Sequence, residues 1–326
     1  MKLKSISALA VAGMVAVSWG SVALAADYTL SVNTALATTD PLYKGLEAFQ
    51  ANVAERSDGV LEVKLFPGSQ LGPDEDVLEQ ARAGAPVAVI VDGGRLAVFQ
   101  KEFGVLGAPF LASGYEGIRK VVTSDMFEEW VKKLHDASGH QVLSFNWWQG
   151  ERHLLTNKPI NGPEDLAGVR MRTPGAPVWI ETIKAMGATP TPMPWGEVYS
   201  AIQQHVIDAA EAQLPAVTGA KLDEVVKYIT KTGHINLITG MVTSAIWFDS
   251  LPADLQVILR EEALKAGDIA SYGTQDSLAQ IEADLVAEGI TVTSPDVTPY
   301  RDATAGVYDM LGYGELRDTL RAMAAE

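Results

Sequence analysis

The chain has 326 residues, of which 47% are hydrophobic, enough to form the core of one large domain or of two lobes. Its 41 acidic residues outnumber 25 basic ones, and the net charge of −16 argues against nucleic acids and anionic membrane surfaces as partners, because both attract clustered Lys and Arg. The sequence contains no cysteine, which excludes disulfides, thiolate metal sites and cysteine nucleophiles.

Residues 1–25 have the pattern of a secretory signal peptide. Lys2 and Lys4 precede an apolar run over residues 6–17, and residues 23–25 form a small-x-small cleavage site. A retained membrane anchor is the alternative interpretation. No later stretch approaches the roughly 20 apolar residues that span a bilayer. Cleavage after residue 25 removes two lysines and no acid, so the charge becomes about −18. We therefore expect an exported protein of the bacterial periplasm.

The first elements alternate between strands and helices. Residues 28–32 are expected to form a strand, and a helix then begins with Asp40 as its cap and Pro41 in its first turn. Alternating polarity predicts a strand over residues 61–65, and a helix with an acidic first turn is expected over residues 73–84.

Residues 87–91 are a continuous apolar run, which is typical of a strand buried on both faces. Strand–helix–strand order predicts a parallel sheet with helices on both faces, and ligands of such sheets bind beyond the carboxyl ends of the strands. Asp92 and Arg95 follow this strand and are therefore candidate ligand contacts. An ordinary turn with a surface ion pair is the alternative.

A further strand over residues 141–145 leads into a segment over residues 146–152 that contains two adjacent tryptophans, Trp147 and Trp148. Because neighbouring strand residues face opposite ways, we expect one tryptophan to pack inward and the other to line a cleft. Core packing of both is the alternative.

A short helix at residues 163–165 precedes the segment 168–174, which carries Arg170 and Arg172 two residues apart. In a strand both side chains would point to the same face. A guanidinium group fits a carboxylate through two parallel hydrogen bonds, so an arginine at a strand end of an acidic protein indicates an anion site. Two solvated strand-edge arginines are the alternative.

The rest of the pattern is a helix over residues 177–186, an extended proline-rich segment over 189–194 that positions Trp195 and Glu197, a helix over 198–204, and a strand over 206–210. From residue 252 to 288 no strong breaker interrupts the helical spacing. A helix of this length could span two lobes.

Motifs of common enzymes are absent: the chain has no Gly-x-Ser-x-Gly, Walker, Gly-x-Gly-x-x-Gly or His-Glu-x-x-His sequence. None of the five histidines pairs with another at metal-ligand spacing on a convincing helix. We therefore predict no catalytic residue, metal site or cofactor.

Several short motifs together resemble the solute-binding proteins of TRAP (tripartite ATP-independent periplasmic) transporters. The strand at residues 169–172 resembles the family's binding strand, whose second basic residue contacts the ligand. The other matching segments, in chain order, are residues 66–72, 102–110, 150–152, 158–160, 163–168, 186–190, 193–199 and 203–208. Each motif is short, but their order and spacing extend over most of the chain after residue 25.

This resemblance implies a two-lobe α/β fold like that of type II periplasmic binding proteins, with a long lobe-spanning helix and a ligand cleft between the lobes. We expect lobe I to comprise residues 26–149 plus 238–278, and lobe II residues 150–237 plus 279–326. The lobes would close over a small organic carboxylate, and the protein, expected to be a monomer and not an enzyme, would deliver it to membrane permease subunits.

The resemblance also assigns site residues. Arg172 should take the carboxylate, Arg152 should be a second polar contact, Asp92 and Arg95 should face a sugar, and Trp195 should pack on the ligand. The family often has Asn where this chain has Ala212, and the adjacent Gln213 is its candidate replacement. Three further residues complete the candidate set: Trp147, Trp148 and Glu197.

Three tryptophans near the expected cleft favour an aromatic acid or a sugar acid, because a short dicarboxylate would need more cations and fewer rings. A periplasmic enzyme or ligand sensor built on the same scaffold is the alternative function, since fold alone does not decide between them.

Overall fold

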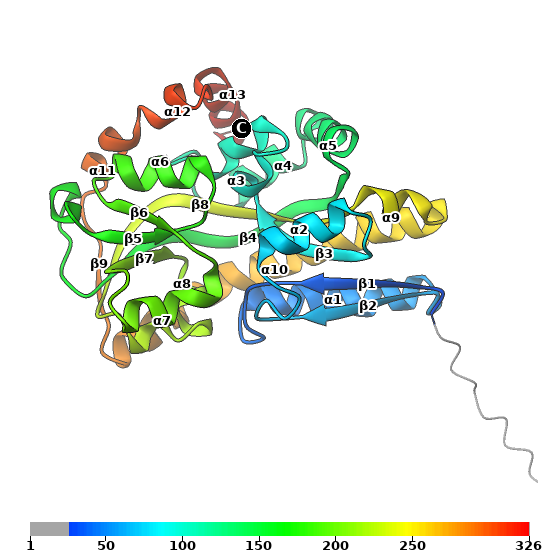
Figure 1. Ribbon diagram of the computed structural model, residues 1–326, viewed down its shortest axis with the longest axis horizontal. Helices are drawn as coiled ribbons and strands as arrows, with labels where there is room; N and C mark the ends of the chain where they lie inside the picture. The colour runs from blue at the N-terminus through cyan, green and yellow to red at the C-terminus, as the bar shows by residue number, and fades with distance from the viewer. Residues whose placement is uncertain (1–25, 326) are drawn as a thin grey trace, which may run out of the picture.

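The computed structural model describes residues 26–325, so the predicted signal peptide lies outside the described residues. Its centre is a nine-stranded sheet with the order β2-β1-β3-β8-β4-β7-β5-β6, and β9 pairs with β8 (Figure 1). The strands are β1 (Tyr28–Asn33), β2 (Leu61–Phe66), β3 (Val87–Asp92), β4 (His140–Thr156), β5 (Arg170–Thr173), β6 (Thr189–Pro192), β7 (Ala209–Ala212), β8 (Tyr228–Ser244) and β9 (Thr291–Thr293).

Helices surround the sheet (Figure 1). The α-helices are α1 (Pro41–Arg56), α2 (Asp74–Arg82), α3 (Gly93–Leu96), α4 (Gly114–Val122), α5 (Asp125–Ser138), α6 (Pro177–Ala185), α7 (Val198–Gln203), α8 (Leu214–Gly219), α9 (Ala245–Ser250), α10 (Ala253–Ala287), α11 (Thr298–Thr304), α12 (Val307–Met310) and α13 (Gly314–Ala325). The short 3-10 helices are η1 (Lys101–Gly107), η2 (Pro163–Leu166), η3 (Trp195–Glu197) and η4 (Leu222–Glu224).

Two long antiparallel strands, β4 and β8, have 17 residues each and connect two halves of the sheet. On one side β3 pairs with β8, and β1, β2 and β3 run parallel to one another. On the other side β7 pairs with β4, and β5, β6 and β7 are parallel. The parallel arrangement predicted from the first three strands is therefore confirmed, and the chain crosses between the halves on the two antiparallel strands β4 and β8.

The long helix α10 confirms the expected 252–288 element and has 35 residues. It contacts α1 on one side of the molecule and α8 on the other, and it also packs on β4. Its approach to α1 is close enough to require a glycine, because a Cβ atom on Gly45 would lie 2.7 Å from the Ala266 carbonyl oxygen. No helix among residues 26–325 is both long and apolar enough to cross a membrane.

Most local predictions are confirmed. Asp40 caps α1, accepting a 2.9 Å hydrogen bond from the backbone N–H of Leu42, and all six residues of β3 are buried. The predicted strand at 206–210 begins later, at Ala209: Val206 is 53% exposed, and the first contact to the sheet is the Asp208 N–H donated to the Arg170 carbonyl.

The predicted lobe boundaries remain proposals. The helix α13, assigned above to lobe II, packs against α4, which lies within the range of lobe I. The C-terminal residues therefore contact both proposed lobes.

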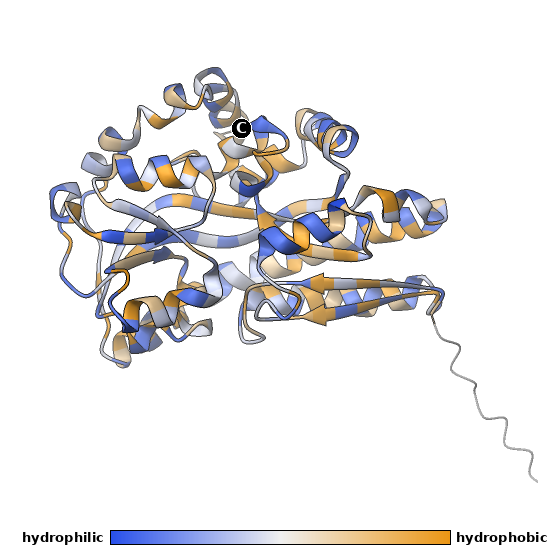
Figure 2. Cartoon of the chain, in the orientation of Figure 1, coloured by the Kyte–Doolittle hydropathy of each residue, from blue (hydrophilic) through white to orange (hydrophobic). Residues whose placement is uncertain are grey.

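Hydrophilic residues, blue in Figure 2, occur along the inner strands as well as on the surface helices. Three polar side chains of β4 and β8 are buried: Gln149, Arg152 and Thr239. Buried polar groups need partners, so their concentration near the middle of the sheet identifies the region where a polar ligand would be held.

Candidate ligand-binding site

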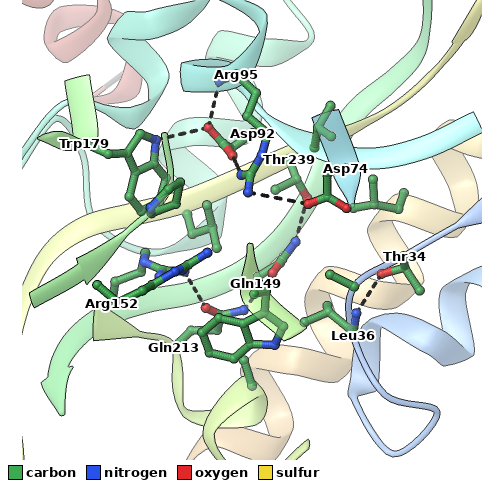
Figure 3. Close-up of a pocket in the computed structure, with 18 residues that line it drawn as sticks. Thr34, Leu36, Asp74, Asp92, Arg95, Gln149, Arg152, Trp179, Gln213 and Thr239 are labelled. Atoms are coloured by element: carbon green, nitrogen blue, oxygen red, sulfur yellow. Dashed lines mark hydrogen bonds and ion pairs between the residues drawn. The ribbon is translucent and has the colours of Figure 1, made fainter. Parts of the chain in front are cut away.

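A cavity with a volume of about 60 Å³ lies at the junction of the two halves of the sheet (Figure 3). Strand ends, helix starts and the crossing strands all contribute to it. The lining residues are Thr34, Ala35, Leu36, Asp74, Ile90, Val91, Asp92, Arg95, Gln149, Arg152, Arg172, Pro174, Trp179, Trp195, Gln213, Ala216, Leu237 and Thr239.

Arg172, on β5, is a buried cation without an anionic partner in the part of the chain that the structure describes. It is 2% exposed, and its Nε and Nη2 donate to the Met193 carbonyl oxygen at 3.1 and 2.9 Å. Among residues 26–325 no carboxylate oxygen lies within 4.0 Å of its guanidinium nitrogens. Burial lowers the pKa of Arg172 to about 9, and repulsion from Arg152 acts in the same direction. An anion in the cavity would relieve both effects.

Arg170, two residues earlier, behaves differently. Its side chain is exposed and pairs with Asp208 at 2.8 Å. The solvated interpretation therefore holds for Arg170 and fails for Arg172.

Arg152, on β4, is by contrast already paired. It forms a buried ion pair with Glu211 on β7 and donates to Gln213 Oε1 at 2.9 Å. Burial by itself raises the pKa of Glu211, but Arg152 and His234 outweigh it, so the net pKa lies below its usual value. The Arg152 guanidinium also lies 4.7 Å from the ring centre of Trp179.

Arg95 is held by three carboxylates. It forms an ion pair with Asp92 and lies 3.6 Å from Asp74 (Figure 3). It also donates to Glu75 at 2.8 Å. Burial raises the pKa of Asp74 to about 6, although Arg95 opposes the effect. The Arg95 corner therefore carries more acid than base, and it offers acceptor oxygens to a ligand.

A chain of amide and hydroxyl groups forms the remaining polar wall. Gln213 Nε2 donates to Gln149 Oε1 at 2.7 Å, and Gln149 Nε2 donates to Thr239 Oγ1 at 3.1 Å. Thr239 in turn donates to the Trp147 carbonyl oxygen at 2.6 Å. The cavity thus combines one unpaired cation with neutral and anionic groups that suit ligand hydroxyls.

The structure brings six of the nine predicted residues to the cavity and leaves three elsewhere. The six are Arg172, Arg152, Trp195, Asp92, Arg95 and Gln213. Glu197 does not line the cavity; it ends the short helix η3 with an exposed side chain.

Neither Trp147 nor Trp148 lines the cavity, so the expectation that one of them faces the cleft is wrong. Their side chains do point to opposite faces of β4, but each face packs against a hydrophobic core, so both tryptophans are core residues. The Trp147 indole donates to Ser144 Oγ at 2.8 Å, and the Trp148 indole donates to Asn236 Oδ1 at 2.6 Å.

Five polar or aromatic lining residues were not predicted: Thr34, Asp74, Gln149, Trp179 and Thr239. Asp74 belongs to the acidic first turn of α2, and Trp179 is one of several apolar residues of α6, so neither position by itself indicates a ligand. The Gly93–Gly94 doublet indicates a close approach of another group, but its spacing does not say which one.

Groups of three or more His, Asp or Glu side chains placed to hold a metal ion do not occur among residues 26–325.

Residues 32–313 match the family model described as bacterial extracellular solute-binding protein, family 7. The sialic acid-binding periplasmic protein SiaP of Vibrio cholerae is 26% identical over 306 residues, covering 94% of each chain. The 2,3-diketo-L-gulonate-binding periplasmic protein YiaO of Escherichia coli is 29% identical over 306 residues, covering 93% of this chain and 92% of its own.

Solved structures of TRAP periplasmic solute binding proteins are also similar to this chain. A TRAP periplasmic solute binding protein from Escherichia fergusonii, in an apo open structure, is 46% identical, with a TM-score of 0.79 over 91% of this chain and 99% of its own. Another from Ochrobacterium anthropi, with bound L-fuconate, is 31% identical, with a TM-score of 0.88 over 92% of this chain and all of its own.

Proposed function

The chain belongs to the family 7 extracellular solute-binding proteins, the solute-binding proteins of TRAP transporters, and we propose that it captures a sugar acid in the cavity around Arg172. The family model and its named relatives are described as solute-binding proteins. The protein would hold the acid unchanged between its two lobes and pass it to membrane permease subunits.

The observation that carries the proposal is the buried, unpaired guanidinium of Arg172. Moving a cation out of water without a counter-charge is unfavourable, and a carboxylate can restore both the charge balance and two parallel hydrogen bonds. Arg152 and Arg95 are less available for this role, because each already pairs with a carboxylate of the chain.

The opposite wall favours a polyhydroxylated ligand over the two alternatives considered above. Asp74, Asp92, Gln149 and Thr239 present oxygens that can accept from hydroxyl groups, and they leave no unpaired cation for a second carboxylate. Of the tryptophans, Trp179 and Trp195 contribute flat apolar walls. Hydroxyl acceptors plus aromatic surface suit a sugar acid better than a short dicarboxylate or a plain aromatic acid.

Relatives support this class of ligand. Solved TRAP solute-binding proteins at 28% identity contain bound L-galactonate or D-glucuronate, and SiaP is named for sialic acid. The chain also superposes better on the L-fuconate complex than on the more identical apo open structure, with TM-scores of 0.88 and 0.79. We infer that the structure described here has the closed, ligand-holding arrangement.

The same proposal implies export of the protein to the periplasm and a membrane permease as its partner. Cleavage after Ala25 would release a monomer into the periplasm, where the closed form meets the permease. N-terminal sequencing of the secreted protein tests this step, and a mature chain that still begins before residue 25 contradicts it.

The ligand class is tested by thermal shift with D-glucuronate, L-galactonate, L-fuconate, succinate and benzoate, together with mass spectrometry of any acid that co-purifies. We expect stabilisation by at least one sugar acid, because a ligand that binds only the folded state raises its stability. Stabilisation by succinate or benzoate alone would reject the sugar-acid assignment. Recovery of the bound acid chemically changed would favour the enzyme alternative.

A further inference from the structure

Trp179 connects the two halves of the molecule beside the cavity. It lies on α6, which follows β5 in the second half, and α6 contacts α3 and η1 of the first half. The indole is 1% exposed, and its Nε1 donates to Asp92 Oδ1 at 3.1 Å (Figure 3). A large aromatic ring with a buried, satisfied N–H is a common anchor in tight interfaces.

Glycines form the slot that receives this ring. A Cβ atom added to Gly94 would lie 2.4 Å from Trp179 Nε1, and one added to Gly107 would lie 3.0 Å from it. Gly94 has no positive φ angle, so its backbone does not require glycine. The space occupied by the indole does require it.

The neighbouring Gly93 shows the contrast. Its added Cβ would meet the Phe103 carbonyl oxygen at 2.2 Å, which is backbone of the same half. Gly93 therefore serves packing within one half, whereas Gly94 serves the contact between the halves.

Trp179 also contacts two charged residues that line the cavity. The Arg152 guanidinium lies 4.7 Å from the ring centre, and Asp92 accepts both from the indole and from Arg95. Trp179 thus spans a basic group of the second half and an acidic group of the first, and all three line the cavity. This set of contacts can form only when the halves are together.

We propose that Trp179 is the positioning residue that joins the two lobes in the closed state, with its indole entering the slot of Gly94 and Gly107 when the lobes close and leaving it when they open. This inference rests on the proposed function in that it assumes two lobes that close. The docking of the indole is nevertheless measurable without any ligand.

The experiment uses the full mature protein labelled with 5-fluorotryptophan. Trp179→Phe identifies the fluorine signal of residue 179, and the response of that signal to replacing H₂O by D₂O reports exposure to water. The test variant is Gly94→Ala. Its matched control is Gly273→Ala on α10, where an added Cβ meets nothing within 4 Å.

We expect the residue-179 signal of Gly94→Ala to respond to D₂O with and without D-glucuronate, L-galactonate or L-fuconate. In the wild type and in Gly273→Ala, addition of an acid that binds should abolish the response. Overpacking of the slot should weaken binding by about tenfold to a hundredfold. Trp179→Phe, which keeps an aromatic ring but loses the N–H donated to Asp92, should weaken it by about tenfold.

A buried residue-179 signal in folded Gly94→Ala would overturn the inference, whichever acids bind. Equal affinity of wild type and Trp179→Phe would also overturn it. If Gly94→Ala does not fold, Gly107→Ala replaces it with the same readout. If none of the three acids binds the wild type, the sugar-acid proposal fails. The inference about Trp179 is still supported if the residue-179 signal is more exposed to water in Gly94→Ala than in Gly273→Ala.

Discussion

The guanidinium carbon of Arg172 lies 5.2 Å from the ring centre of Trp195, and both side chains line the same cavity. The ring and the Met193 carbonyl hold the guanidinium in place, and neither neutralises its charge. Cation–π contact and a neutral acceptor orient a cation while leaving it available to an anion. This geometry leaves Arg172 available to the solute carboxylate that we propose.

Arg172→Lys is expected to weaken acid binding at least about a hundredfold, because a point charge loses the two-pronged hydrogen bonding of guanidinium. Calorimetric titration measures the change. The matched control is Arg170→Lys on the same strand, where the side chain is exposed and pairs with Asp208. Wild-type affinity in Arg172→Lys, or equal losses in both variants, would contradict the role.

Trp195→Ala should weaken binding by about tenfold to a hundredfold, since it removes both the cation–π contact to Arg172 and an apolar wall of the cavity. Trp195→Phe should recover most of the loss, because it restores a ring. The two variants are compared by titration with the same acid. Full affinity in Trp195→Ala would show that the ring does not contact the ligand.

Glu211→Gln should destabilise the protein by about 3–5 kcal/mol, because it leaves the buried Arg152 without its counter-charge. Urea unfolding of the ligand-free protein measures the difference. Asp208→Asn, which breaks the exposed pair with Arg170, should cost only about 0–1 kcal/mol. Similar losses in the two variants would refute the distinction between buried and exposed pairs.

The pH dependence of this pair has a defined direction. The pKa of Glu211 lies below its usual value of 4.5 in the folded protein, so the folded state favours the ionised form. Its contribution to the free energy of unfolding is present above about pH 4.5 and decreases as the pH falls through the folded pKa. Glu211→Gln should therefore show a smaller loss of stability on acidification than the wild type.

Asp74 should have the opposite effect on the pH dependence of the free energy of unfolding. Burial raises its pKa from 3.8 to about 6, so the folded state binds a proton more tightly than the unfolded state, and the stability from this group is lost as the pH rises from about 4 to about 6. Asp74→Asn should be more stable than wild type at pH 7, by on the order of 1–3 kcal/mol, with little difference at pH 4. Arg95 keeps Asp92 and Glu75 as partners in this variant.

The control for this prediction is Asp76→Asn, an exposed acid in the same helical turn. Urea unfolding between pH 4 and 7 compares the three proteins. A pH profile of Asp74→Asn parallel to that of wild type would contradict the assignment.

Much of the fold could be predicted because its signals are local. The cap at Asp40, the apolar run of β3 and the unbroken helical spacing of α10 each depend on residues close together in the sequence. The antiparallel centre of the sheet could not be derived this way, since the pairing of β4 with β8 joins segments about 90 residues apart.

The candidate site also has features that the local sequence predicts and features that depend on distant residues. Family-like motifs favoured Arg172 as the ligand contact, but spacing alone could not separate it from Arg170, whose strand position predicts the same face. The difference arises from Asp208, which pairs with Arg170 at the surface. Trp147 and Trp148 were misjudged because the sequence does not show that β4 has a hydrophobic core on both sides. Trp179 was missed because its slot comes from Gly94 and Gly107, more than 70 residues earlier.

The most direct test of the central claim is a crystal structure of the protein with the acid that co-purifies with it. The account predicts a carboxylate bound by two hydrogen bonds of about 3 Å to the guanidinium of Arg172, with the lobes closed over it. A complex in which the acid is held elsewhere, and Arg172 contacts only the chain or bulk water, would contradict it.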